Sequence, residues 1–197
     1  MQTLLTIWTQ PKKTFEYLDN NNGIVGGINL DLLYYLGSLS LVIPGIPTIV
    51  SKYDTKGEPV ALLIIIALSA AIFGALFLRL LLKFVHSYVL WKVGKVLEGK
   101  ASKSQVQMVI AYSLVPGLIS LLFSLVLIIV AIFMNDINIV GYQNPLTLFI
   151  IWIFGFRTLI YGLARFNRFS YGYAIINVIF VATMFQAIAL GIKYLMQ

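Results

Sequence analysis

Five long apolar segments, almost free of charged residues, dominate the pattern of hydrophobic and polar positions along the chain. They cover residues 30–50, 60–82, 106–133, 146–163 and 171–195. Each segment is long enough to cross a bilayer, which takes about 20 mostly apolar residues in a helix. We therefore predict an all-α fold: a polytopic integral membrane bundle of five transmembrane helices.

The polar segment ahead of the first span has the pattern of an amphipathic helix on a membrane surface. In residues 4–18, Phe15 lies on the apolar face, and Lys12 and Lys13 lie on the face toward water. Pro11 suits a first helical position, because its missing N–H would be unpaired there, so the helix is expected to break beside it. The segment either docks on the membrane or caps the bundle. We divide the chain into a cytoplasmic interfacial segment, 1–29, and a five-helix domain, 30–197.

Aromatic and basic side chains flank the predicted spans, where such residues anchor helices at the membrane interface. The candidate interface residues are Trp8, Lys12, Lys13, Phe15, Lys83, Lys92 and Lys95. The periodicity of the second span continues beyond its apolar core. We therefore expect one long helix whose last turns are amphipathic and cytoplasmic.

Basic residues are unevenly distributed between alternate loops. The N-terminal segment and the second and fourth loops carry eight of them, Lys12, Lys13, Lys92, Lys95, Lys100, Lys103, Arg165 and Arg168. The first loop and the C-terminus carry three, Lys52, Lys56 and Lys193. The positive-inside rule then predicts a multi-pass protein of the cell membrane, with its N-terminus in the cytoplasm and its C-terminus outside.

Composition excludes several classes of site and partner. The chain has 197 residues, 60% of them hydrophobic, a net charge of +7 and no cysteine, which excludes disulfides and thiolate metal sites. We reject nucleic acid as a partner because the basic residues cluster beside the membrane segments. The expected partners are the lipid bilayer and either another membrane protein or a second copy of the chain. The single histidine and the absence of catalytic or phosphate-loop motifs predict no metal, no cofactor and no enzymatic activity.

Pro116 lies about halfway along the predicted third span. A proline there frees the carbonyl of Tyr112, four residues earlier, and Ser113 lies beside that carbonyl. A helix broken at mid-membrane can line a binding cavity, although such breaks are more often packed kinks. Both alternatives stay open at this stage.

Ionisable residues inside a membrane usually face the bundle and are paired. Asp31, Arg79 and Arg157 all fall in the predicted cytoplasmic half, so Asp31 is expected to pair with Arg157 or with Arg79. For Arg79 and Lys83 we prefer extension toward the headgroups. For Arg157 we prefer a partner. The candidate intramembrane polar site comprises Asp31, Arg79, Tyr112, Ser113, Pro116 and Arg157.

Three short motifs resemble the Yip family, five-span membrane proteins related to Rab/Ypt-interacting proteins, in its short prokaryotic form. They are Pro11-Lys12-Lys13-Thr14-Phe15, similar to a P-x-x-[ST]-F leader, the turn from Gly94 to Gly99-Lys100-Ala101-Ser102, and Ala111-Tyr112-Ser113-Leu114-Val115-Pro116, similar to G-Y-x-x-x-P. Ala111 replaces the usual glycine. The Gly-Pro of the D-L-x-G-P element, which would begin at Asp31, is absent.

The resemblance implies a non-enzymatic membrane protein linked to membrane organisation or trafficking. We expect a scaffold or adaptor that binds a partner protein or shapes lipid packing. The alternative is a small carrier, channel or lipid-moving protein that uses a polar site near the Pro116 break. A polar cavity lined by Tyr112, Ser113 and Arg157 would favour the carrier, and a tightly packed bundle would favour the adaptor.

Overall fold

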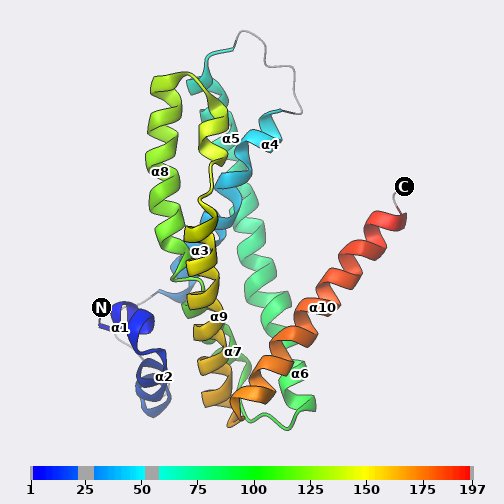
Figure 1. Ribbon diagram of the computed structural model, residues 1–197. Helices are drawn as coiled ribbons and strands as arrows, with labels where there is room; N and C mark the ends of the chain where they lie inside the picture. The colour runs from blue at the N-terminus through cyan, green and yellow to red at the C-terminus, as the bar shows by residue number, and fades with distance from the viewer. Residues whose placement is uncertain (1, 22–28, 52–57, 196–197) are drawn as a thin grey trace. The chain divides into compact units, whose positions relative to one another are not determined.

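The computed structural model describes residues 2–21, 29–51 and 58–195, and all the regular secondary structure in these residues is helical (Figure 1). Five helical stretches are long and apolar enough to cross a membrane: Leu30–Val50, Val60–Val96, Gly117–Met134, Ile137–Asn167 and Tyr171–Leu195. The predicted all-α fold with five transmembrane helices is confirmed. Lys52 and Lys56, which contribute to the predicted orientation, lie outside the described residues.

The chain divides into two compact units that are each assembled from separate stretches. Unit 1 takes Met1–Ile28, Lys83–Ile110 and Arg157–Gln197, and unit 2 takes Asn29–Leu82 and Ala111–Phe156. The N-terminal segment therefore shares a unit with two later stretches of the chain. The division of the chain into an interfacial segment, 1–29, and a five-helix domain, 30–197, stays a prediction.

Unit 2 is built around the packing of α3 against α5 and α8. Its elements are α3 (Leu30–Val42), η1 (Ile43–Gly45), α4 (Ile46–Val50), α5 (Val60–Leu80), α8 (Gly117–Met134), η3 (Ile137–Gly141) and the first part of α9 (Pro145–Asn167). Pro44 and Pro47 interrupt the first span as a short 3-10 turn, which is the kink expected of prolines inside a helix. Ile46 and Val140, both fully buried, belong to the apolar core of this unit.

Unit 1 combines the N-terminal helices with parts of the later helices. Its elements are α1 (Gln2–Thr9), α2 (Pro11–Asn20), most of the π-helical η2 (Leu81–His86), α6 (Ser87–Val96), most of α7 (Lys103–Ser113), the end of α9 and α10 (Tyr171–Leu195). The fully buried Asn177 of α10 donates a hydrogen bond to the carbonyl of Leu90 in α6 (3.3 Å). This amide joins two helices, as intramembrane amides commonly do.

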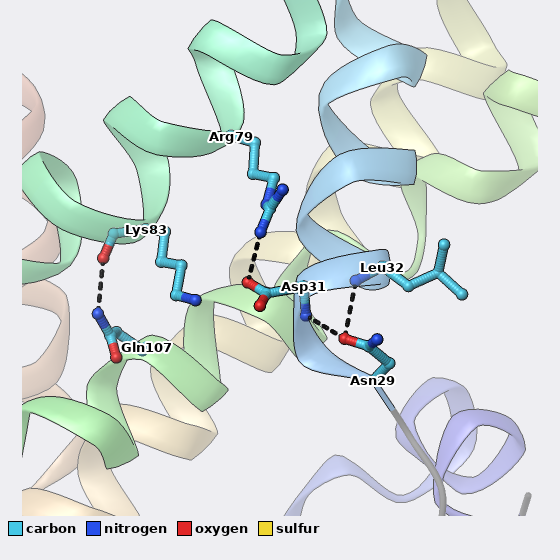
Figure 2. Close-up of polar contacts among 6 residues, drawn as sticks. All are labelled: Asn29, Asp31, Leu32, Arg79, Lys83 and Gln107. Atoms are coloured by element: carbon cyan, nitrogen blue, oxygen red, sulfur yellow. Dashed lines mark hydrogen bonds and ion pairs between the residues drawn. The ribbon is translucent and has the colours of Figure 1, made fainter.

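The second span runs on as one long helix through α5, η2 and α6, as the periodicity predicts. In its π-helical segment the backbone hydrogen bonds join residues five apart, and such segments are frequent at functional sites. The carbonyl of Lys83 accepts hydrogen bonds from the hydroxyl of Ser87 and from the amide of Gln107 (2.9 Å; Figure 2). The second bond ties α7 to this part of the long helix.

The third span differs from the prediction. Residues 106–113 belong to α7, which has 11 residues and is too short to cross a bilayer. The span begins at Gly117, so Pro116 caps its start instead of lying halfway along it. The error has a physical cause: Val106 and Val109 are fully buried within the protein, and hydropathy alone does not distinguish protein-facing from lipid-facing apolar residues.

Candidate functional site

Asp31 and Arg79 form an ion pair within unit 2 (Figure 2). Asp31 lies in the first turn of α3, where the side chain of Asn29 caps the helix by accepting the N–H groups of Asp31 (2.9 Å) and Leu32 (3.2 Å). Arg79 lies in the last turn of α5, with a guanidinium nitrogen 3.1 Å from a carboxylate oxygen of Asp31. The charge of Asp31 is also favoured by its place at the N-terminus of α3, the positive end of the helix dipole. Arg79 thus pairs with Asp31, one of the two predicted alternatives, although we preferred extension toward the headgroups for this side chain.

Arg157, the other predicted partner of Asp31, belongs to unit 1. Its guanidinium lies over the ring of Tyr161, 5.6 Å from the ring centroid. A pair between Asp31 and Arg157 would join different units, so that alternative stays a prediction. The ammonium of Lys83 lies 5.5 Å from the ring centroid of Phe84.

The helix break before Pro116 is closed by short-range backbone hydrogen bonds. The carbonyl of Tyr112 accepts the N–H of Val115 (3.2 Å), and the carbonyl of Leu114 accepts the N–H of Gly117 (2.9 Å). The expectation of a freed carbonyl at Tyr112 is therefore wrong, because tighter turns replace the helical bonds that the proline removes. The Tyr112 side chain is also buried, with 1% of its surface exposed.

Close helix packing surrounds the same break within unit 2. A Cβ atom added at Gly37 of α3 would lie 2.7 Å from the Cβ atom of Leu114, and one added at Gly155 of α9 would lie 3.0 Å from the carbonyl oxygen of Ser113. Glycine allows these backbones to approach closely, as small residues do in membrane bundles. Close packing of this kind is expected of a packed kink, and the alternative of a binding site at Pro116 stays a prediction.

Within unit 1, the two N-terminal helices bury their apolar face. Ile7, Phe15 and Leu18 are each at most 1% exposed, and the rings of Phe15 and Phe166 meet edge to face at 6.0 Å. The break between α1 and α2 falls at Pro11, as predicted. Phe15, which we expected at the membrane interface, is instead buried within the protein.

Asp19 connects the end of α2 to the end of α9. One carboxylate oxygen lies 3.0 Å from Nε of Arg165 and 3.0 Å from a guanidinium nitrogen of Arg168, and the Asp19 side chain is 11% exposed. Sequence reasoning missed this bridge. The usable signal was an acid at the end of an amphipathic helix, together with two arginines three residues apart in a loop assigned to the same side of the membrane.

The glycine turn that resembles the Yip family holds a buried amide of α9. The side-chain oxygen of Asn167 accepts the N–H of Ala101 (3.3 Å), and its backbone carbonyl accepts the N–H of Lys100 (3.2 Å). Gly99 lies so close to this oxygen that a Cβ atom there would collide with it. The Asn167 side-chain nitrogen is buried and has no hydrogen-bond partner among the described residues.

Two pockets lie within unit 1. The smaller, of about 320 Å³, is lined chiefly by Lys12, Glu16, Tyr161, Arg165, Arg168 and Tyr171. The larger, of about 560 Å³, lies where α6 and α9 end and α10 begins, beside Lys100, Asn167 and Ser170. Tyr112, Ser113 and Arg157, the residues expected to line a transport cavity, line neither of these two pockets. Among the described residues no cluster of three or more His, Cys, Asp or Glu side chains could hold a metal ion.

Comparison with known proteins identifies the family. No curated protein and no solved structure matches the chain. The family model of the Yip1 domain matches residues 5–192, which run from α1 to α10 and include the leader, the glycine turn and the Pro116 break. The resemblance inferred from the three motifs is therefore confirmed: the chain belongs to the Yip1-domain family of membrane proteins.

Proposed function

We propose that this Yip-family chain acts without catalysis, as a membrane scaffold or adaptor that presents its N-terminal helices to a partner protein at the cytoplasmic surface. The observation that carries the proposal is the docking of α2. Its apolar face is buried, and Asp19 fastens its end to Arg165 and Arg168. The opposite face, with Lys12, Lys13 and Tyr17, stays exposed. A helix held in this way offers a preorganised surface, which lowers the entropic cost of binding.

The cytoplasmic location rests on the distribution of charge. The N-terminal segment and the second and fourth loops carry eight basic residues against three on the alternate side. Such an excess favours the cytoplasm in short loops. The exposed face of α2 then meets soluble or membrane-bound proteins of the cytoplasm.

The packing around Pro116 favours the adaptor over the carrier. The carrier hypothesis needs an unsatisfied backbone or a polar cavity at the break. Here the carbonyl of Tyr112 is hydrogen-bonded, and Leu114 packs closely against Gly37.

Site-specific photo-crosslinking in intact cells tests the proposal. A photoreactive phenylalanine analogue replaces Tyr17 in one protein and, as the matched control, Tyr142 in another; both tyrosines are exposed, and they lie on opposite predicted sides. We expect a discrete protein adduct at position 17 that does not form at position 142. The absence of an adduct at position 17, or the same adducts at both positions, would contradict the adaptor proposal.

Reconstitution into liposomes tests the carrier hypothesis separately. The purified protein is assayed for solute flux and for lipid flip-flop against protein-free liposomes. We expect no excess over the protein-free control. An excess that disappears in Pro116→Ala, while the variant stays folded, would support the carrier and overturn the adaptor as the principal function.

A further inference from the structure

The larger pocket of unit 1 lies at the polar ends of three candidate membrane spans. Val96 ends the second span, Asn167 ends the fourth, and Ser170 precedes the first residue of the fifth; all three line the pocket. Phe169 and Tyr173, whose ring centroids are 6.0 Å apart, line it as well. Aromatic residues at the ends of spans mark the headgroup level of a bilayer. The pocket is therefore placed where charged lipid headgroups and dissolved ions both have access.

Two cations give the pocket its charge. Lys100 and Arg168 line it, and Glu98 is the carboxylate of the same lining. The guanidinium of Arg168 is held in place by its contact with Asp19, and its side chain is still 52% exposed. A fixed guanidinium can offer its remaining donors to an anion at little entropic cost.

The N-terminus of α10 forms part of one wall of the pocket. This helix has 25 residues, and its first turn follows Ser170, whose hydroxyl accepts the N–H of Tyr173 (3.4 Å). The first N–H groups of a helix point out of its N-terminus, and the helix dipole favours an anion there.

Asn167 supplies an independent indication of a ligand. It lines the pocket, it is only 3% exposed, and its side-chain nitrogen has no hydrogen-bond partner among the described residues. The hydrogen bond from Ala101 to its oxygen fixes the orientation of the amide, so the nitrogen is a donor that cannot be exchanged for the acceptor by a flip. Buried donors are rarely left unsatisfied in proteins.

We propose that this pocket binds a phosphate ester. Lys100, the remaining donors of Arg168, a helix N-terminus and an unsatisfied amide donor outweigh the single carboxylate of Glu98. Together they favour an anion with several acceptor oxygens, and a phosphate group provides them. The ester can be the headgroup of an anionic lipid or a small soluble phosphate. Basic pockets at the ends of transmembrane helices are suited to anionic headgroups. The site does not depend on the adaptor function, because a chain that binds no partner protein can still bind phosphate.

Thermal unfolding of the purified, delipidated full-length protein tests the proposal. The probes are short-chain phosphatidic acid, the matching short-chain diacylglycerol and glycerol 3-phosphate. We expect phosphatidic acid to raise the unfolding temperature with increasing concentration and diacylglycerol to leave it unchanged, because a ligand that binds only the folded state stabilises it. Glycerol 3-phosphate distinguishes a soluble phosphate ester from a lipid headgroup. A shift in unfolding temperature equal to that caused by phosphatidic acid identifies a soluble ester, and a much weaker shift identifies a lipid.

Three single-charge variants locate the binding in the pocket. Lys100→Gln should weaken the affinity for phosphatidic acid about tenfold, the loss expected for one hydrogen bond to a charged group. Glu98→Gln should strengthen it, since a repelling carboxylate is removed. Lys92→Gln is the matched control: Lys92 lies over the rings of Tyr88 and Trp91, outside the pocket lining, and its loss should leave the affinity unchanged.

The proposal is overturned if phosphatidic acid and diacylglycerol shift the unfolding temperature equally, or if neither shifts it. It is also overturned if Lys92→Gln and Lys100→Gln weaken binding to the same extent, because diffuse surface charge would then account for the effect.

Discussion

A carboxylate forms ion pairs with arginine in each unit, Asp31 in unit 2 and Asp19 in unit 1. Asp31 pairs with Arg79 and is 43% exposed, whereas Asp19 pairs with Arg165 and Arg168 and is 11% exposed. The contribution of an ion pair falls as its members become more exposed to water. We therefore expect Asp19 to matter more for stability than Asp31.

The substitution Asp19→Asn should destabilise the docking of α2. It removes the negative charge that Arg165 and Arg168 share, and because both arginines are partly exposed we expect a cost of about 1–2 kcal/mol. Hydrogen exchange of the α2 backbone should rise together with a lower unfolding temperature. Glu16→Gln, on the same helix and outside the Asp19 bridge, is the control and should change little. Equal effects of the two variants would show that the Asp19 bridge does not hold the helix.

A double-mutant cycle tests which arginine is the partner of Asp31. Asp31→Asn and Arg79→Gln should each lower the unfolding temperature in detergent, and the double variant should cost less than the sum by about 0.5–1 kcal/mol. The matched cycle pairs Asp31→Asn with Arg157→Gln and tests the other alternative left open by the sequence. Additivity in the first cycle with coupling in the second would contradict the observed pair.

At the scale of helices, glycine decides how closely α3 approaches the Pro116 break. Gly37→Ala should cost about 1–3 kcal/mol, because the new methyl group would meet Leu114 at 2.7 Å and a tightly packed site has little room to adjust. Gly45→Ala, in the same span, is the matched control, since nothing lies within 4 Å of the added atom. Thermal unfolding of the two variants should differ clearly. A neutral Gly37→Ala would show that the break is loosely packed and would restore the case for a cavity there.

Sequence patterns predicted the helices that face lipid better than the helices that face protein. The first and fifth spans have the predicted bounds, because long uninterrupted apolar runs signal a bilayer directly. The third was extended into α7, whose Val109 packs with Phe15 against Gly162 of α9. No local pattern shows that an apolar face will be covered by a helix nearly 100 residues away in the chain.

The ion pairs of the candidate site were also only partly predictable from the sequence. The pair of Asp31 and Arg79 was among the predicted alternatives, because desolvation in a membrane requires a partner for each charge. The pair of Asp19 and Arg165 joins residues 146 positions apart, outside any predicted span, where pairing is not required. Its partners could only be chosen once α2 was known to fold onto α9.

At the scale of the whole molecule, the odd number of candidate spans predicts that the two ends of the chain lie on opposite sides of the membrane. The distribution of charge then predicts that the N-terminus is inside. The direction matters for both proposals, because the exposed face of α2 and the phosphate pocket belong to segments that the charge rule assigns to the cytoplasm.

Cysteine labelling tests this orientation, and the absence of native cysteine makes single introduced thiols unambiguous. Ser102 and Asn138 are both exposed and belong to the second and third loops predicted from the sequence, so their thiols should be equally reactive once the membrane is opened. In intact cells, Ser102→Cys should be protected from a membrane-impermeant reagent and Asn138→Cys should react. The reverse pattern would show the opposite orientation, with α2 and the pocket outside the cell. Reaction at both positions would instead contradict the odd number of spans between them.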